Sequence, residues 1–211
     1  MWETAALVRD KGVSAALRSS MNDVATWADV ERSVLVELAG VDGCVAIVFS
    51  DIEGSTALND KMGDRAWNAV LKDHERVVAR QVARHHGHIV KNQGDGYMMA
   101  FAQASQAARC AIGIERAMVK KLLRLGPNIQ VRMGIHYGSV VHRDNDIFGR
   151  NVALAARVAA LADGGEVLIS GAVVDQLEGD DELDLMVTDV RSVELRGLSG
   201  EHLIATLDWQ D

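Results

Sequence analysis

The chain lacks the features that mark membrane and exported proteins. Its 211 residues include no apolar run that approaches the roughly 20 residues needed to cross a bilayer. The N-terminus carries no cationic segment followed by an apolar one, which is the pattern of a secretory signal. From these absences we expect that the chain is neither inserted into a membrane nor exported.

Positive charge is also scarce. Lysine and arginine number 22 against 30 aspartates and glutamates, which gives a net charge of −8. Without a basic stretch to neutralise phosphates, nucleic acid is not expected as a partner. A phosphate-bearing small molecule remains compatible with this charge, because local backbone amides and a bound metal can outweigh the net charge.

Cysteine is limited to two positions, Cys44 and Cys110. Both lie in apolar surroundings, and neither has a neighbour at a metal-ligand or redox spacing. We therefore expect two buried free thiols in a reducing cytoplasm.

The composition that remains is that of a folded protein, with 48% hydrophobic and 25% charged residues. The length suits one domain with a short additional segment. Residues 1–39 contain no proline and only one glycine, Gly12, which favours helix. Gly40 and Gly43 then mark a boundary. We predict a helical extension over residues 1–40 and a single domain over 41–211.

Strand-like and helix-like segments alternate along this domain. An apolar run at 44–49 predicts a buried strand, followed by a loop at 50–56. The order strand, helix, hairpin, helix, strand then predicts an α+β fold with a ferredoxin-like βαββαβ core, its helices on one face of the sheet. The remaining parts of this unit are a helix from Trp67, a hairpin of 88–91 and 97–101, a helix over 107–122 that stops before the only proline, Pro127, and a strand at 129–135. Beyond the unit we expect a strand at 139–142, a helix at 151–162, a strand at 166–170 and extra C-terminal strands between 184 and 208.

The segment FSDIEGST (49–56) carries the first candidate site. Asp51 directly follows the buried strand, and Gly54, Ser55 and Thr56 precede the next helix. Successive amides there can form a concavity for a phosphate, with Asp51 holding a divalent cation on it. The segment alone leaves a second interpretation open, a helix cap and turn with an exposed aspartate.

The segment KNQGDG (91–96) carries the second candidate site. Asp95 lies at the tip of the predicted hairpin, between two glycines. In a ferredoxin-like sheet the first strand and the hairpin are neighbours, so Asp51 and Asp95 can meet. Two carboxylates together with substrate phosphates form the oxygen-rich ligand set that Mg²⁺ accepts.

Four segments together resemble the class III nucleotidyl cyclases. They are FSDIEGST, KNQGDG, VRMGIHYG (131–138) and DIFGRNVALAARV (146–158), and they occur in the family's order and at suitable spacing. Four ordered matches on the expected elements are far more specific than one. The resemblance covers roughly residues 43–205, and the short link between Gly138 and Asp146 is similar to the bacterial branch with a short dimerisation arm.

This resemblance implies an adenylyl cyclase that converts ATP to 3′,5′-cyclic AMP and pyrophosphate. It implies a head-to-tail homodimer with two interfacial sites, each holding two Mg²⁺ or Mn²⁺ ions. Asp51, Asp95 and the Ile52 carbonyl would bind these ions. The segment that binds the substrate phosphates would consist of Glu53, Gly54, Ser55 and Thr56.

Lys91 and Asp146 of the other chain would bind the base. Adenine has an acceptor at N1 and a donor at its N6 amine, which match an ammonium and a carboxylate. Guanine reverses both, so this pair predicts ATP rather than GTP. Outside the resemblance, Lys91 would be an ordinary solvated lysine at a strand end.

Two arginines complete the implied site. Arg157 matches the family arginine that stabilises charge on the phosphates in the transition state. Arg196, in ELRGLSG, matches a basic residue near the triphosphate more loosely. The alternatives are a helix-surface arginine at 157 and a solvated arginine at 196.

One position departs from the family pattern. An asparagine is expected four residues before Arg157, and this chain has Ala153 there. Asn151, two positions away, lies on a different helix face. Because one preorganised donor is worth about 10²–10³ in rate, we expect a slow enzyme. The alternative is a weak or inactive cyclase-homology domain that binds ATP, dimerises and regulates another activity.

Overall fold

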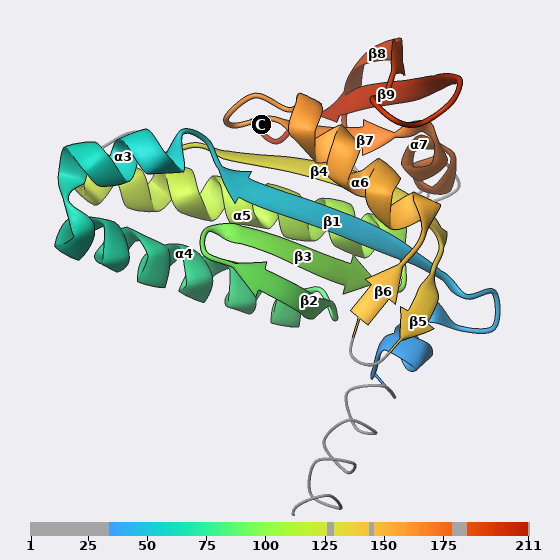
Figure 1. The fold of residues 1–211 in the computed structure, drawn as a ribbon, viewed down its shortest axis with the longest axis horizontal. Coiled ribbons are helices and arrows are strands. Elements are labelled where there is room, and N and C mark those ends of the chain that lie inside the picture. The colour runs from blue at the N-terminus through green and yellow to red at the C-terminus, as the bar shows by residue number, and fades with distance from the viewer. Residues whose placement is uncertain (1–33, 126–128, 144–145, 179–184, 211) are drawn as a thin grey trace, which may run out of the picture.

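The computed structural model describes residues 34–125, 129–143, 146–178 and 185–210 (Figure 1). Most of the predicted helical extension, residues 1–33, therefore lies outside the described residues. Residues 34–39 form a helix, as expected. Leu35 and Ala39 of this helix are buried in one cluster with Val45 and Ile47, so the end of the extension packs on the domain.

A seven-stranded sheet forms the centre of the molecule, in the order β2-β3-β1-β4-β7-β9-β8. The βαββαβ core is confirmed, because β1 lies between β3 and β4 and pairs antiparallel with both. This is the ferredoxin-like strand order. The elements of the core are β1 (Cys44–Ile52), α3 (Ser55–Met62), α4 (Asp64–Arg84), β2 (His88–Gln93), β3 (Gly96–Phe101), α5 (Ala104–Leu125) and β4 (Val131–Ser139).

The C-terminal half extends this sheet, as the sequence predicts. Strand β7 (Val167–Ser170) pairs parallel with β4, and β8 (Val187–Glu194) and β9 (Glu201–Leu207) continue the sheet antiparallel. Two short strands, β5 (Val141–Arg143) and β6 (Asp146–Phe148), form a separate ribbon. Neither β6 nor the seven-residue helix α7 (Gly171–Leu177) was expected, since both are too short to show periodicity.

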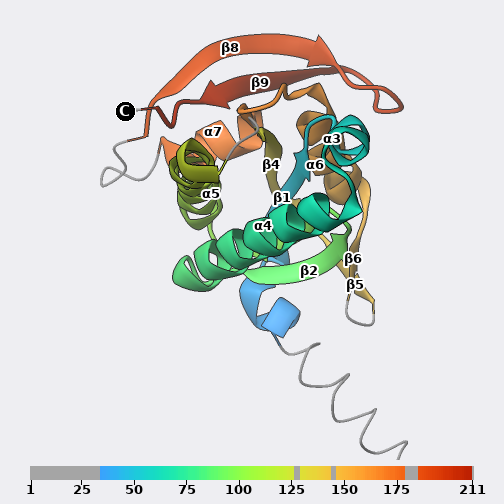
Figure 2. The same ribbon diagram turned by 90° about the vertical axis from the view of Figure 1, so that its left-hand side faces the viewer.

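Helices cover both faces of the sheet (Figures 1 and 2). Helices α4 and α5 cover one face, as expected for the core unit, and α6 (Arg150–Leu161) lies on the other. The alternation of β1 fits this arrangement, because Ala46 and Val48 join the cluster of α4 and α5 whereas Val45 and Ile47 join that of Ala155. The helices of the core unit therefore lie on one face, as predicted, and α6, which follows that unit in the chain, covers the other.

A glycine allows α6 to approach the sheet. A Cβ added to Gly134 of β4 would lie 2.1 Å from the Ala159 nitrogen, closer than any real side chain allows. The backbone of α6 thus rests directly on β4. This contact sets the position of the helix that carries Arg157.

The predicted loop at 50–56 was also too long. Strand β1 continues to Ile52 and α3 begins at Ser55, so two residues connect them. The extra strand residues pair with β4, Asp51 opposite Arg132 and Ile52 opposite Val131. Tertiary pairing, not hydrophobicity, extends the strand here.

Both cysteines are free thiols, but only one is buried. Burial raises the pKa of Cys110 to about 12, which keeps this thiol protonated. Cys44, at the start of β1, is partly exposed, against the expectation. Among the described residues no helix has the length and apolar character to span a membrane.

Candidate functional site

A cavity of about 330 Å³ lies where the ends of β1, the β2–β3 hairpin and β4 meet α6. Asp51, Lys91 and Arg132 contribute its charged groups. Small residues of α6 line the opposite side, so the space is not filled by side chains of that helix. The cavity is lined by Phe49, Ser50, Asp51, Lys91, Gln93, Gly96, Tyr97, Met98, Arg132, Ala156, Ala159 and Ala160.

The two candidate metal-binding aspartates come to the same end of the sheet. A Cβ added to Gly96 would lie 3.7 Å from Asp51 Oδ1, so the Asp51 carboxylate rests on the residue next to Asp95. Gly94 has φ +66°, which the tight turn at the hairpin tip requires of its first central residue. Asp95 Oδ2 is buried and has no hydrogen-bond partner among the described residues.

Arg132 is the charged residue that sequence reasoning missed. It lies opposite Asp51 on β4, and its Nη2 and Nε donate to Asp51 Oδ2 at 2.7 and 3.2 Å. A signal was present, since Arg132 is the second residue of VRMGIHYG, one of the four segments. The pairing with Asp51 depends on the strand register, which the sequence does not specify.

Lys91 and Asp146 form an ion pair within one chain. Asp146, on β6, also accepts a hydrogen bond from the Ile147 amide at 2.9 Å, which orients its carboxylate. Lys91 Nζ lies 5.3 Å from the ring centroid of Phe148, a cation–π distance. The lysine side chain is 51% exposed and the aspartate side chain 18%, so the pair remains accessible at its ammonium end. Sequence reasoning did not single out Phe148.

Several predicted residues lie outside the cavity. Asp146 contacts Lys91 but does not itself line the cavity. Arg157 is exposed on α6, one position beyond Ala156. Arg196 is exposed in the turn between β8 and β9. One chain therefore brings together Asp51, Asp95 and Lys91 near this cavity, but not the two arginines.

Asn151 does not take the place of the missing asparagine. Its Nδ2 donates to the Ser139 carbonyl at 2.8 Å, and its Oδ1 lies 3.1 Å from His136 Nε2. His136 also lies 2.7 Å from Ser170 Oγ, and burial lowers the pKa of this histidine. Asn151 thus belongs to a structural network, whereas Ala153 is exposed.

The β1–α3 connection has the chemistry of an anion site. Gly54, before the first turn of α3, has φ +62°, and no side chain of the described residues caps the helix, so its first amides are available as donors. The Glu53 amide donates to the Gln130 carbonyl at 2.9 Å. The Glu53 carboxylate lies against Gly164, where an added Cβ would be 2.3 Å from Oε2.

A buried histidine supports the cavity from the other face of the sheet. His74 of α4 packs edge-on against Tyr97, with ring centroids 5.4 Å apart. Burial lowers its pKa to about 4, although the negative charge of Asp51 acts in the opposite direction. His74 is therefore neutral at pH 7.

The donor set fits a cation that shares its ligands with substrate. No cluster of three or more histidine, cysteine or acidic side chains that could hold a metal occurs in the described part of the chain. Asp51 and Asp95 offer two carboxylates, and the buried Asp95 Oδ2 has no hydrogen-bond partner within the described ranges. Mg²⁺ commonly accepts one or two carboxylates when phosphates and waters complete its shell.

Comparisons with known proteins agree with this geometry. Residues 39–207 match the family described as the adenylate and guanylate cyclase catalytic domain. An uncharacterized protein of Mycobacterium tuberculosis is 32% identical over 177 residues, which cover 79% of this chain. An adenylate cyclase of Lachancea kluyveri is 30% identical over 166 residues, or 67% of this chain. A solved adenylate cyclase of Trypanosoma brucei, in its monomeric state, superposes with a TM-score of 0.69 at 26% identity, covering 78% of this chain and 89% of that one.

The two relatives matched by sequence, the mycobacterial protein and the Lachancea enzyme, are longer than this chain. It spans 59% of the mycobacterial relative and 9% of the Lachancea enzyme. The similarity therefore concerns one domain of these proteins.

Proposed function

The chain belongs to the adenylate and guanylate cyclase catalytic-domain family, and we propose that it is an adenylyl cyclase. The reaction is the conversion of ATP to 3′,5′-cyclic AMP and pyrophosphate. The ribose 3′-oxygen forms a bond to the α-phosphorus, the bond from that phosphorus to the pyrophosphate oxygen breaks, and the hydroxyl proton leaves to solvent. No protein nucleophile is needed.

The Lys91–Asp146 ion pair carries the choice of ATP. It presents a donor and an acceptor side by side, which adenine N1 and N6 match and guanine does not. The family includes both adenylate and guanylate cyclases, so the fold alone leaves the base open. The residues at this pair distinguish the two.

Asp51, Asp95 and the Ile52 carbonyl would hold two Mg²⁺ or Mn²⁺ ions. When bound, such ions lower the pKa of the 3′-hydroxyl and offset charge on the phosphates. Arg132 now occupies Asp51 Oδ2, so this guanidinium has to leave that oxygen before it can serve as a ligand. The first amides of α3, at Gly54, Ser55 and Thr56, would bind the phosphates, with Glu53 ordering the turn.

We propose that the enzyme works as a head-to-tail homodimer. Arg157 does not line the cavity of its own chain, so a second chain has to supply it to the phosphates. Arg196 would approach the triphosphate in the same assembly. We place the enzyme in the cytoplasm, where free thiols such as those of Cys44 and Cys110 persist.

A second candidate function follows from Ala153. Without the expected asparagine, the domain would turn over slowly, or bind ATP and dimerise as a regulatory module without measurable turnover. Both candidates use the same base and phosphate contacts. Turnover separates them.

The deciding experiment measures cyclic AMP produced by the purified chain with Mn²⁺ and ATP over a range of protein concentrations. We expect activity that rises with concentration as dimers form. Asp51→Ala should abolish it, whereas Asp175→Ala, an exposed acid on α7, should not. Inactivity at concentrations where sedimentation shows a dimer would reject the cyclase and leave the regulatory module.

A further inference from the structure

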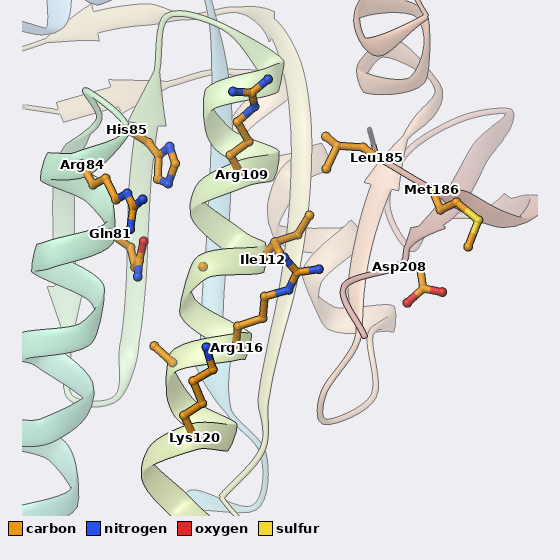
Figure 3. A pocket seen from close by; sticks show the side chains of 12 residues that line it. Gln81, Arg84, His85, Arg109, Ile112, Arg116, Lys120, Leu185, Met186 and Asp208 are labelled. Carbon is orange, nitrogen blue, oxygen red and sulfur yellow. The ribbon is translucent and has the colours of Figure 1, made fainter. Parts of the chain in front are cut away.

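A larger cavity, of about 640 Å³, shares no lining residue with the proposed catalytic one. It crosses the outer surface of α5, between the C-terminal end of α4 and residues 185–186 and 208 (Figure 3). We call it the basic groove. It is lined by Gln81, Arg84, His85, Arg109, Ile112, Gly113, Arg116, Ala117, Lys120, Leu185, Met186 and Asp208.

The groove concentrates positive charge on an acidic chain. Among the described residues, four cationic side chains and one histidine line it, against a single carboxylate, whereas the whole chain carries −8. Asp208 lies beside Met186, on the far side of α5 from Arg84 and His85 (Figure 3). Such a local excess of one sign concentrates counter-ions of the other.

Three of these cations have no counter-ion in the part of the chain that the structure describes. Within the described residues, no carboxylate forms a salt bridge with Arg84, Arg109 or Lys120. By contrast, Arg76, also on the surface of α4, pairs with Asp73 at 2.9 Å. Among the described residues, Arg84, Arg109 and Lys120 are thus not part of a helix-surface charge network.

Other contacts hold the groove in place. The Gln81 side chain of α4 lies against α5, because a Cβ added to Gly113 would come within 2.5 Å of Gln81 Oε1. On the other side Arg116 Nε donates to the Trp209 carbonyl at 2.9 Å, which ties α5 to the C-terminal segment. Ile112, Leu185 and Met186 add an apolar surface.

We propose that the basic groove binds a small organic anion that carries phosphoryl groups, at a site separate from catalysis. Arginine forks bind phosphate oxygens in a bidentate manner, and Arg84 and Arg109 approach the groove from different helices. The apolar wall suits a ring or carbon chain on the same ligand. The volume lies within the range of about 300–1,000 Å³ that is usual for small-molecule sites.

The positive field of the groove also acts on His85. Partial burial lowers the pKa of His85, and the positive charges of Arg84, Arg109 and His86 lower it further. A bound phosphoryl group would favour the imidazolium, so the pKa of His85 should rise on binding. His85 therefore serves as a reporter inside the groove.

The test uses inorganic triphosphate as the probe, with EDTA present so that metal-dependent binding at the catalytic cavity is excluded. Calorimetry compares the wild type with the double variant Arg84→Gln/Arg109→Gln. The matched control is Lys72→Gln/Arg80→Gln, which removes the same charge from exposed positions of α4 outside the groove. All of these side chains are exposed, and thermal unfolding checks that each variant folds.

We expect the groove variant to weaken the Kd at least about tenfold and the control variant less than about twofold. When inorganic triphosphate is added to the wild type, the NMR signal of His85 should shift, because the ligand binds beside it in the groove. Equal weakening in both variants, or binding that leaves the His85 signal unchanged, would overturn the proposal. Neither readout depends on cyclase activity, so the result is independent of the proposed function.

Discussion

Lys91 shows how single residues prepare the proposed base site. Its ammonium contacts the Asp146 carboxylate on one side and lies 5.3 Å from the Phe148 ring on the other. A long, half-exposed lysine would otherwise lose considerable rotamer entropy on binding a ligand. The carboxylate and the ring restrict it in advance, which reduces that loss.

The contribution of the ring can be measured with Phe148→Leu. A cation–π contact at an exposed site is worth about 0.5–1 kcal/mol, so the KM for ATP should rise about two- to fivefold. Phe148 is 44% exposed, so global stability should hardly change. Phe148→Trp keeps the contact and serves as control. An unchanged KM in the leucine variant would show that the ring does not position Lys91.

The base contacts can be tested by reversal. Lys91→Glu combined with Asp146→Cys removes the donor for adenine N1 and the acceptor for its amine. ATP turnover should fall by about two orders of magnitude, because each mismatched polar contact leaves a group unpaired. GTP turnover should rise relative to ATP. Competition assays with both nucleotides measure the ratio, and an unaltered preference would refute the base-binding roles.

At the scale of elements, α6 limits the proposed catalysis. Gly134 lets its backbone rest on β4, so the helix is placed rigidly, and Arg157 and Ala153 are both exposed on it. An asparagine at position 153 would therefore fit without repacking. Asn151 remains engaged with Ser139 and His136 and does not compete.

We expect Ala153→Asn to raise kcat by about tenfold or more, because it restores one preorganised donor to the developing charge. Ala153→Asp is the matched control, since it has the same shape but, when ionised, no donor. Steady-state rates with Mn²⁺ and ATP provide the measurement. A gain in both variants, or in neither, would contradict the role assigned to this position.

At the scale of the whole molecule, the proposed dimer makes a quantitative prediction. Asp51→Ala and Arg157→Ala should each be inactive as homodimers. In an equal mixture about half of the dimers are heterodimers, and one of their two sites is intact. Activity should recover to about a quarter of the wild type, as measured after refolding or co-expression. No recovery would place both residues in a site formed by one chain.

Stability should also depend on a buried acid. Glu115 is buried, one oxygen has no partner within the described residues, and burial raises its pKa from 4.5 to about 8. Between these values the folded state binds more protons than the unfolded state, so this residue makes the free energy of unfolding fall as pH rises. His74 has the opposite effect, because its pKa is lowered from 6.5 to about 4 in the folded state. Its contribution to the free energy of unfolding therefore rises with pH between these two values.

Glu115→Gln should therefore increase the free energy of unfolding at pH 8.5 by on the order of a few kcal/mol. At pH 5 the variant and the wild type should nearly agree, since Glu115 is protonated in the fold. Urea denaturation at the two pH values measures the difference. A difference of equal size at both would show that ionisation of Glu115 is not the cause.

The sequence by itself determined the core elements and the family resemblance. Local periodicity marks the long helices and the hairpin, and the resemblance rests on residue types at fixed spacing, which need no coordinates. Only the tertiary structure decided the pairing of Arg132 with Asp51, the contact of Phe148 with Lys91, the position of α6 and the basic groove. All of these features bring together residues that are distant in sequence, through strand register or helix packing. Short-range sequence patterns carry no information about strand register or about how helices pack.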